Sequence, residues 1–202
     1  MSAAIKRGYA PAGRAQIHYR RAGSPDQPLL VLLHQTPSTS EMYEPLMREL
    51  AGKFDLLAPD TPGFGNSDAI DGEFSVPNAA SALAAAVRWV RRDAAFWFGH
   101  HTGAALALQV AATHPEQVRR LAMSGPCLLS DAQKEKLPKM AAHVPAANDG
   151  GHFKTIWDRI AAKDAEAPVA LRQRETLAGI AAGVAYGQAY AAVTAIDTLC
   201  AA

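Results

Sequence analysis

Several features that mark particular classes of protein are scarce or missing in this 202-residue sequence. Lys and Arg number 20 against 19 Asp and Glu, which argues against a nucleic-acid binder that neutralises phosphates with excess basic residues. No apolar run approaches the roughly 18 residues that span a membrane, and no apolar segment follows Lys6 and Arg7 as it would in a secretory signal. We therefore expect a cytoplasmic protein that binds neither nucleic acid nor membrane.

Cysteine is equally scarce. Cys127 and Cys200 are far apart and lack partners at metal-ligand spacing, so the sequence predicts neither a disulfide scaffold nor a zinc site. Cys127 follows a predicted strand end, where it is a candidate pocket residue or a buried, inert thiol. Apolar residues, in contrast, make up 49% of the chain and charged residues only 19%, which is enough for a sizeable core. The length suits one domain, or one domain with a cap.

Predicted strands and helices alternate along the first two thirds of the chain. Apolar runs bounded by turn residues predict buried strands at 29–33, 54–58, 95–98 and 118–123, after a strand at 16–21 that pairs with one near 5–9. Helical spacing of apolar residues predicts helices at 41–50, 79–92 and 103–113. This alternation favours a parallel sheet with helices on both faces. After Gly125 the patterns are helical only.

The most informative segment is Gly99-His100-His101-Thr102-Gly103, where a buried strand runs directly into a helix. In a Gly-x-x-x-Gly turn of this kind the glycines let strand and helix pass closely, and the central residue takes a strained conformation beside the helix N-terminus. Two loops that follow other buried strands also carry unusual residues. They are His34-Gln35-Thr36-Pro37 and the Gly-rich loop at 60–68.

In their order and spacing, these three segments resemble the α/β-hydrolase fold superfamily, and in particular its branch of haloalkane dehalogenases, epoxide hydrolases and related esterases. The resemblance covers roughly residues 16–125. It implies an α/β-hydrolase core at 1–128 and a helical cap at 129–202, with a nucleophile elbow, an oxyanion hole, a small-molecule substrate and no cofactor. It leaves the reaction open, since one fold hosts many functions.

Two departures from the family pattern lie at chemically decisive positions. His101 occupies the place of the nucleophilic Ser, Asp or Cys, and Gln35 replaces the Gly of the oxyanion loop. His101 is the candidate catalytic residue, because a neutral imidazole can act as nucleophile or general base. The resemblance assigns the oxyanion hole to the backbone N–H groups of Thr36 and Thr102. The side-chain amide of Gln35 is a third candidate donor.

Further candidates for the pocket are weaker. We expect His34 to order its loop through hydrogen bonds and His100 to point away from His101, because successive side chains at a sharp turn usually diverge. Trp157 falls in the helical region, where it either lines the pocket or packs in the core. No metal site is expected, because no carboxylate or His at ligand spacing accompanies His101.

The resemblance also implies two more strand–helix units, about 55 residues, that carry a catalytic acid and a His. Residues 130–202 hold no counterpart of them, so we expect a C-terminally truncated hydrolase fold whose open sheet edge a second copy would cover as a homodimer. The leading hypothesis is a hydrolase of a small apolar ester, lactone or related carbonyl compound. The alternatives are a non-catalytic ligand-binding relative and a cofactor-free lyase that uses His101 as its base.

Overall fold

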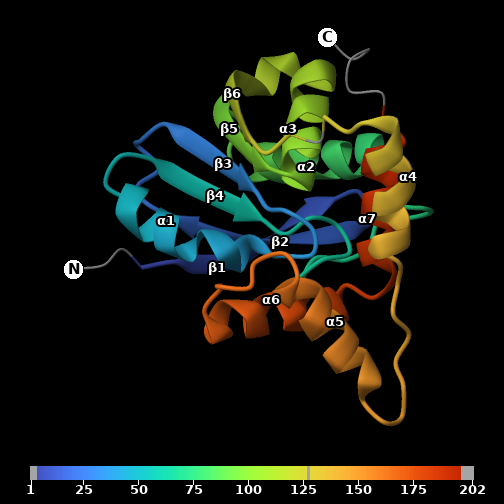
Figure 1. The fold of residues 1–202 in the computed structure, drawn as a ribbon. Coiled ribbons are helices and arrows are strands. Elements are labelled where there is room, and N and C mark those ends of the chain that lie inside the picture. The colour runs from blue at the N-terminus through green and yellow to red at the C-terminus, as the bar shows by residue number, and fades with distance from the viewer. Residues whose placement is uncertain (1–3, 127, 197–202) are drawn as a thin grey trace.

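The computed structural model describes residues 4–126 and 128–196. At its centre lies a six-stranded sheet in the order β1-β2-β4-β3-β5-β6 (Figure 1). β2 is antiparallel to β1 and β4, whereas β4, β3, β5 and β6 run parallel to one another. The strands are β1 Lys6–Ala12, β2 Ala15–Ala22, β3 Leu29–Leu33, β4 Asp55–Pro59, β5 Ala95–His100 and β6 Val118–Ser124. This mostly parallel sheet confirms the predicted α/β fold class.

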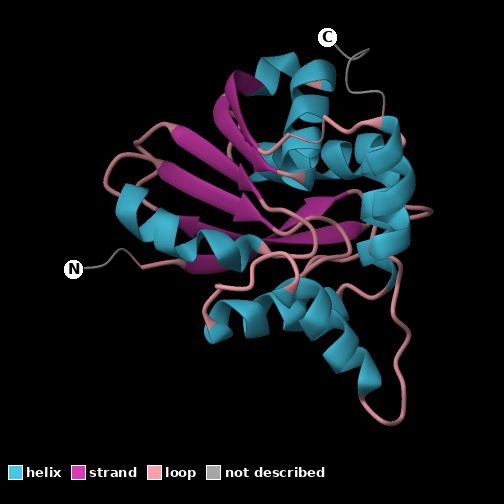
Figure 2. Cartoon of the chain, viewed as in Figure 1, coloured by secondary structure: helices cyan, strands magenta, loops and turns pink. Residues whose placement is uncertain are grey.

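Helices cover both faces of the sheet (Figure 2). Alternate residues of β3 enter two separate cores, because successive side chains of a strand point to opposite faces. Leu32 packs with Met47 of α1, whereas Val31 and Leu33 pack with α2 and α3. The helices are α1 Glu44–Leu50, α2 Val76–Val90, α3 Thr102–Thr113, α4 Asp131–Met140, α5 Gly151–Ala161, α6 Val169–Ala181 and α7 Val184–Thr194.

The helix boundaries differ from the predicted ones where local caps decide them. α2 begins three residues earlier than expected, because the Ser75 hydroxyl accepts a hydrogen bond from the Asn78 N–H and Pro77 suits the first turn. The predicted helix 41–50 starts with a 3₁₀ turn, Ser40–Tyr43, before α1. Each difference concerns an end and leaves the element order as predicted.

The region after Gly125 is helical in the described residues, as expected. α5 and α6 pack against each other, and Figure 1 shows them together at one end of the sheet. α7 returns to the core, where Tyr186, Ala189 and Val193 join the cluster built by α2 and α3. The division into a core at 1–128 and a cap at 129–202 stays a prediction. No helix in the described part of the chain is long and apolar enough to cross a membrane.

β6 forms one edge of the sheet and pairs with β5 only. Beside this edge, the face that carries α1 has a cavity of about 440 Å³ lined mainly by apolar side chains, among them Leu30, Phe96, Phe98 and Leu121. Open strand edges and apolar faces of this kind favour pairing with further polypeptide. The homodimer expected from the sequence stays a prediction.

The passage from β5 into α3 depends on two glycines. A Cβ at Gly99 would overlap the Gly103 carbonyl, and a Cβ at Gly103 would overlap the carbonyl groups of Leu33 and His34. Strand β3, strand β5 and helix α3 therefore meet backbone to backbone. This contact places His101 at the turn between them, as the Gly-x-x-x-Gly pattern predicts.

Substitution of Gly103 tests this contact. Gly103→Ala should lower the free energy of unfolding by at least about 2 kcal/mol, because the added methyl group meets backbone that cannot move independently. Urea or thermal unfolding measures the loss. Gly52→Ala is the matched control, since a Cβ at Gly52 meets no atom within 4 Å. Equal stability of the two variants would show that the elbow tolerates a side chain.

Candidate active site

His101 has an unusual backbone conformation at the elbow between β5 and α3. Its φ is 49° and its ψ is −115°, and it is the one non-glycine residue of the described chain with a positive φ. Its N–H donates to the Ser124 carbonyl at 3.0 Å, and its own carbonyl accepts from the Ala104 N–H at 2.8 Å. Strain of this kind persists only where the surrounding structure enforces it. The strained turn predicted from the sequence is thus present.

The His101 ring is exposed and has two close neighbours. The rings of His100 and His101 lie 4.5 Å apart between centroids, with their planes at 68°. The expectation that these side chains diverge is therefore wrong. His100 turns back because its Nδ1 lies 3.2 Å from the Ser124 carbonyl oxygen on the adjacent strand. Gly125, with φ 57°, leaves room for the His101 ring, which a Cβ at that position would crowd.

The surroundings lower the pKa of His101 below its ordinary value of 6.5. Partial burial is the largest cause, followed by the neighbouring His100 ring and the ammonium group of Lys163. Both of these neighbours, and the N-terminus of α3, disfavour a second positive charge. In the described part of the chain, no carboxylate forms a hydrogen bond or ion pair with His101. The ring is therefore neutral at pH 7, the form that attacks a carbonyl carbon or accepts a proton.

The two residues expected to supply the oxyanion donors, Thr36 and Thr102, are hydrogen-bonded to each other. The Thr36 N–H donates to the Thr102 hydroxyl at 2.7 Å, and that hydroxyl in turn donates to the Thr36 hydroxyl at 3.0 Å. The Thr36 amide therefore already has an acceptor in this conformation. The backbone N–H of Thr102 opens α3, where the first N–H groups have no acceptor within the helix.

A pocket of about 640 Å³ lies over the elbow and brings together four of the residues singled out in the sequence, Gln35, Thr36, His101 and Thr102. Residues that follow β6 complete its wall. They are Gly125, Pro126, Leu128, Leu129, Gln133, Leu137, Lys163, Tyr190, Val193 and Thr194. The pocket is mainly apolar, with polar groups gathered near His101, the usual character of a small-molecule site.

Three other candidates lie outside this wall. His34 is buried behind the loop, where its Nε2 accepts from the Thr61 N–H at 2.9 Å and its Nδ1 lies 2.9 Å from the Gln35 carbonyl oxygen. Burial lowers the pKa of His34, so the ring is a neutral support for the loop, as expected. His100 binds the Ser124 carbonyl, and the Trp157 ring packs under the Arg172 guanidinium at 5.5 Å. Cys127 lies outside the described residues. No group of three metal-binding side chains occurs in the described chain.

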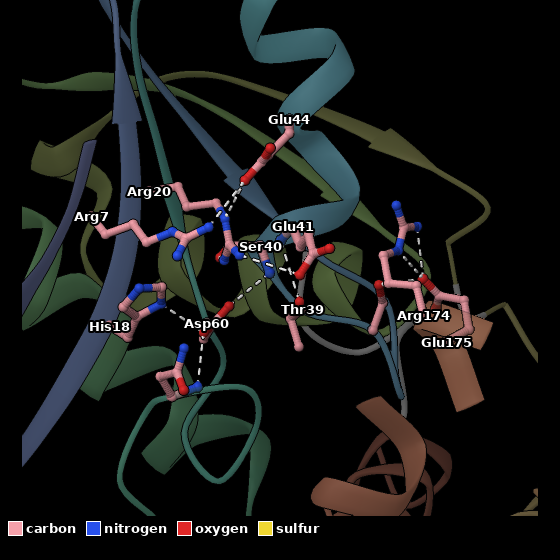
Figure 3. Close-up of polar contacts among 12 residues, drawn as sticks. Arg7, His18, Arg20, Thr39, Ser40, Glu41, Glu44, Asp60, Arg174 and Glu175 are labelled. Atoms are coloured by element: carbon pink, nitrogen blue, oxygen red, sulfur yellow. Dashed lines mark hydrogen bonds and ion pairs between the residues drawn. The ribbon is translucent and has the colours of Figure 1, made fainter. Parts of the chain in front are cut away.

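A buried carboxylate, Asp60, connects several loop segments (Figure 3). Asp60 accepts hydrogen bonds from the Ser40 N–H at 2.7 Å and the Asn66 N–H at 3.0 Å, and its Oδ2 lies 2.8 Å from His18 Nδ1. Burial acts to raise the pKa of Asp60, but these bonds and the nearby His34 hold it well below its usual range. Asp60 thus ties the start of the 3₁₀ turn at Ser40 to the loop at 60–68. Gly65 is required there, because a Cβ would overlap the carboxylate.

Among the pocket residues that the sequence did not predict, Lys163 and Tyr190 contact each other. Lys163 follows α5, and its ammonium donates to the Tyr190 hydroxyl at 3.2 Å. Tyr190 comes from α7, and its hydroxyl donates to the Thr36 carbonyl at 3.3 Å. A lysine at a helix end and a tyrosine in an Ala-rich helix carry no motif, so only the tertiary fold places them near His101.

Comparison with known proteins agrees with the geometry of the elbow. A family model described as the alpha/beta hydrolase fold matches residues 28–167, well over half of the sequence. The chain belongs to the α/β hydrolase fold family. The family assignment, first made as a resemblance on the elbow and two loops, is thereby confirmed.

Individual α/β hydrolases match parts or most of the chain. A 107-residue stretch is 34% identical to 2-(acetamidomethylene)succinate hydrolase from Mesorhizobium japonicum and covers 53% of this chain and 38% of that protein. A 50-residue stretch is 46% identical to an uncharacterized hydrolase from Saccharomyces cerevisiae and covers 25% and 17%, respectively. The crystal structure of the enol-lactonase from Burkholderia xenovorans LB400 has a TM-score of 0.75 at 21% identity, over 94% of this chain and 74% of that one. This structural match shows the α/β hydrolase fold alone.

The matched stretches cover 38% and 17% of the lengths of these two hydrolases, respectively. The activities of these longer proteins can therefore be carried over to this chain only as a proposal.

The bond between Thr36 and Thr102 generates a stability prediction. Thr102→Val removes the acceptor of the buried Thr36 N–H while keeping the side-chain volume, so the free energy of unfolding should fall by about 1–3 kcal/mol. Chemical denaturation measures the change. Thr102→Ser keeps the hydroxyl and should lose clearly less. If Val and Ser variants were equally stable, the hydrogen bond would not hold the loop on α3.

Proposed function

We propose that the elbow pocket cleaves a small, largely apolar ester, lactone or related carbonyl compound, with His101 as nucleophile or general base. One observation carries the proposal: His101, with its strained backbone at the strand–helix elbow, lines a pocket of about 640 Å³. Its lowered pKa favours the neutral ring there. The names of the family relatives, a hydrolase and an enol-lactonase, support the same class of reaction.

As nucleophile, a neutral ring nitrogen of His101 would attack the carbonyl carbon and form a tetrahedral intermediate. The intermediate would expel the alcohol, with proton transfer to the leaving oxygen, and leave an acyl-imidazole. Water would then add to this acyl group, release the carboxylic acid and restore the ring. As general base, His101 would instead take a proton from the attacking water, and no covalent intermediate would form.

The oxyanion of either route needs hydrogen-bond donors that face the pocket. The Thr102 N–H at the start of α3 fits this role, and the helix N-terminus adds favourable charge. The Thr36 N–H becomes a second donor only when the Thr102 hydroxyl rotates away from it, since the two groups are now bonded. The Gln35 side chain, which also lines the pocket, is a third candidate.

Two observations favour a second candidate function, a ligand-binding protein without turnover. Within the described residues, no carboxylate supports His101, and the Thr36 amide is already engaged. A ligand that raises the melting temperature and is recovered unchanged would favour this alternative. The lyase hypothesis uses the same pocket with His101 as the base. It predicts products of elimination or of carbon–carbon bond cleavage, not of hydrolysis.

His101→Ala tests the hydrolase proposal directly. With p-nitrophenyl acetate and butyrate as substrates, kcat/KM should fall at least about 10²-fold, the usual contribution of a positioned base or nucleophile. Release of p-nitrophenolate measures the rate. His114→Ala, at the far end of the same helix, should keep the activity.

Equal rates for wild type and His101→Ala would contradict a role of His101. If neither wild type nor His101→Ala cleaved the esters, and wild type bound a ligand tightly without hydrolysing it, the ligand-binding alternative would be favoured.

A further inference from the structure

Lys163 occupies a junction between two cavities. It lines the pocket over the elbow and also a neighbouring cavity of about 280 Å³ between α5, α6 and the oxyanion loop. Gln35 is the other residue that the two cavities share. A ligand at the elbow that extends from His101 toward the cap therefore passes Lys163.

The charge of Lys163 is unopposed on the elbow side. Among the described residues that line the elbow pocket, Lys163 is the one with a full charge, and no Asp or Glu is present. One of its three N–H donors reaches the Tyr190 hydroxyl at 3.2 Å, and the ammonium lies 5.7 Å from the centre of that ring. Tyr190 thus orients the ammonium without neutralising it.

The neighbouring cavity has two acids, Asp164 and Glu175. Glu175 Oε1 accepts hydrogen bonds from Arg174 at 2.8 Å and from the Ser38 hydroxyl at 2.9 Å, whereas Glu175 Oε2 is buried without a hydrogen-bond partner among the described residues. No ion pair holds Lys163 in the part of the chain that the structure describes. The two positive features at the elbow, Lys163 and the N-terminus of α3, therefore act in the same direction on a ligand.

We propose that Lys163 binds the carboxylate of an anionic substrate, so that the pocket selects small carbonyl compounds that carry a carboxylate beyond the bond to be cleaved. This inference rests on the proposed hydrolase function for the cleavage step, but not for the binding step. The carboxylate accepts hydrogen bonds from the ammonium, while the reacting carbonyl lies between His101 and the Thr102 N–H. The apolar wall accommodates the short chain that joins them.

A binding experiment tests the carboxylate site without any turnover. Glutarate is titrated calorimetrically into the 202-residue protein and into Lys163→Met and Lys163→Arg. We expect Lys163→Met to bind at least about tenfold more weakly, because one charge-assisted hydrogen bond is lost. Lys163→Arg keeps the charge and should stay within about threefold of wild type. Lys154→Met, on the exposed side of α5 and paired with Asp158, is the matched control and should be unchanged.

Equal binding of glutarate by wild type and Lys163→Met would overturn the proposal. So would the absence of glutarate binding by wild type at about 20 mM, a concentration that detects even millimolar affinity. Equal affinity of wild type for glutarate and for its neutral dimethyl ester would overturn it as well. Circular dichroism confirms that each variant is folded. Lys163→Arg is a second test, since a folded variant that keeps the charge but loses binding would also contradict an anion site.

A kinetic experiment separates this proposal from the hydrolase function. The substrates are mono-p-nitrophenyl glutarate and the neutral p-nitrophenyl butyrate. Lys163→Met should raise KM for the anionic ester at least about tenfold more than it raises KM for the neutral ester. If neither ester is cleaved by wild type, the hydrolase proposal fails, and the glutarate titration still decides whether Lys163 holds a carboxylate.

Discussion

The backbone contact of Gly103 with the carbonyl groups of Leu33 and His34 is the constraint on which the rest of the site depends. Because Gly103 has no side chain, α3 can start directly against β3, and the chain turns sharply as it leaves β5. The turn gives His101 its positive φ and presents its ring to the pocket, while the same contact brings Thr102 to the oxyanion loop. One close approach of three backbones thus positions His101 and the two residues proposed as oxyanion donors, Thr36 and Thr102.

Two further interactions support this arrangement. The buried Asp60 carboxylate holds the backbone of Ser40, four residues after Thr36, and the backbone of Asn66. Tyr190 connects the helical region to the loop that carries Thr36 through the Thr36 carbonyl, and it binds the Lys163 ammonium beside the pocket. The segment from Thr36 to Ser40 is therefore held by three separate parts of the chain, and only the Thr102 hydroxyl has to move to free the Thr36 amide.

The sequence predicted those parts of the molecule that short-range patterns specify. Buried strands appear as apolar runs, and the elbow as Gly99 and Gly103 around His101, because close packing of strand and helix excludes side chains locally. The predicted start of α2 is three residues too late, because the prediction omits the cap that Ser75 forms. The orientation of His100, the bond between Thr36 and Thr102, and the place of Lys163 were not predicted, since each depends on a partner far away in the chain that has no motif of its own.

Chemical rescue of His101→Ala tests whether the imidazole of His101 is the reactive group of the elbow. The rate of p-nitrophenyl acetate cleavage by the variant is measured against the concentration of added imidazole, after subtraction of the rate with imidazole alone. We expect a low rate that rises and saturates as neutral imidazole fills the space left by the ring. A rate equal to that of wild type without imidazole, and indifferent to its addition, would contradict this role of His101.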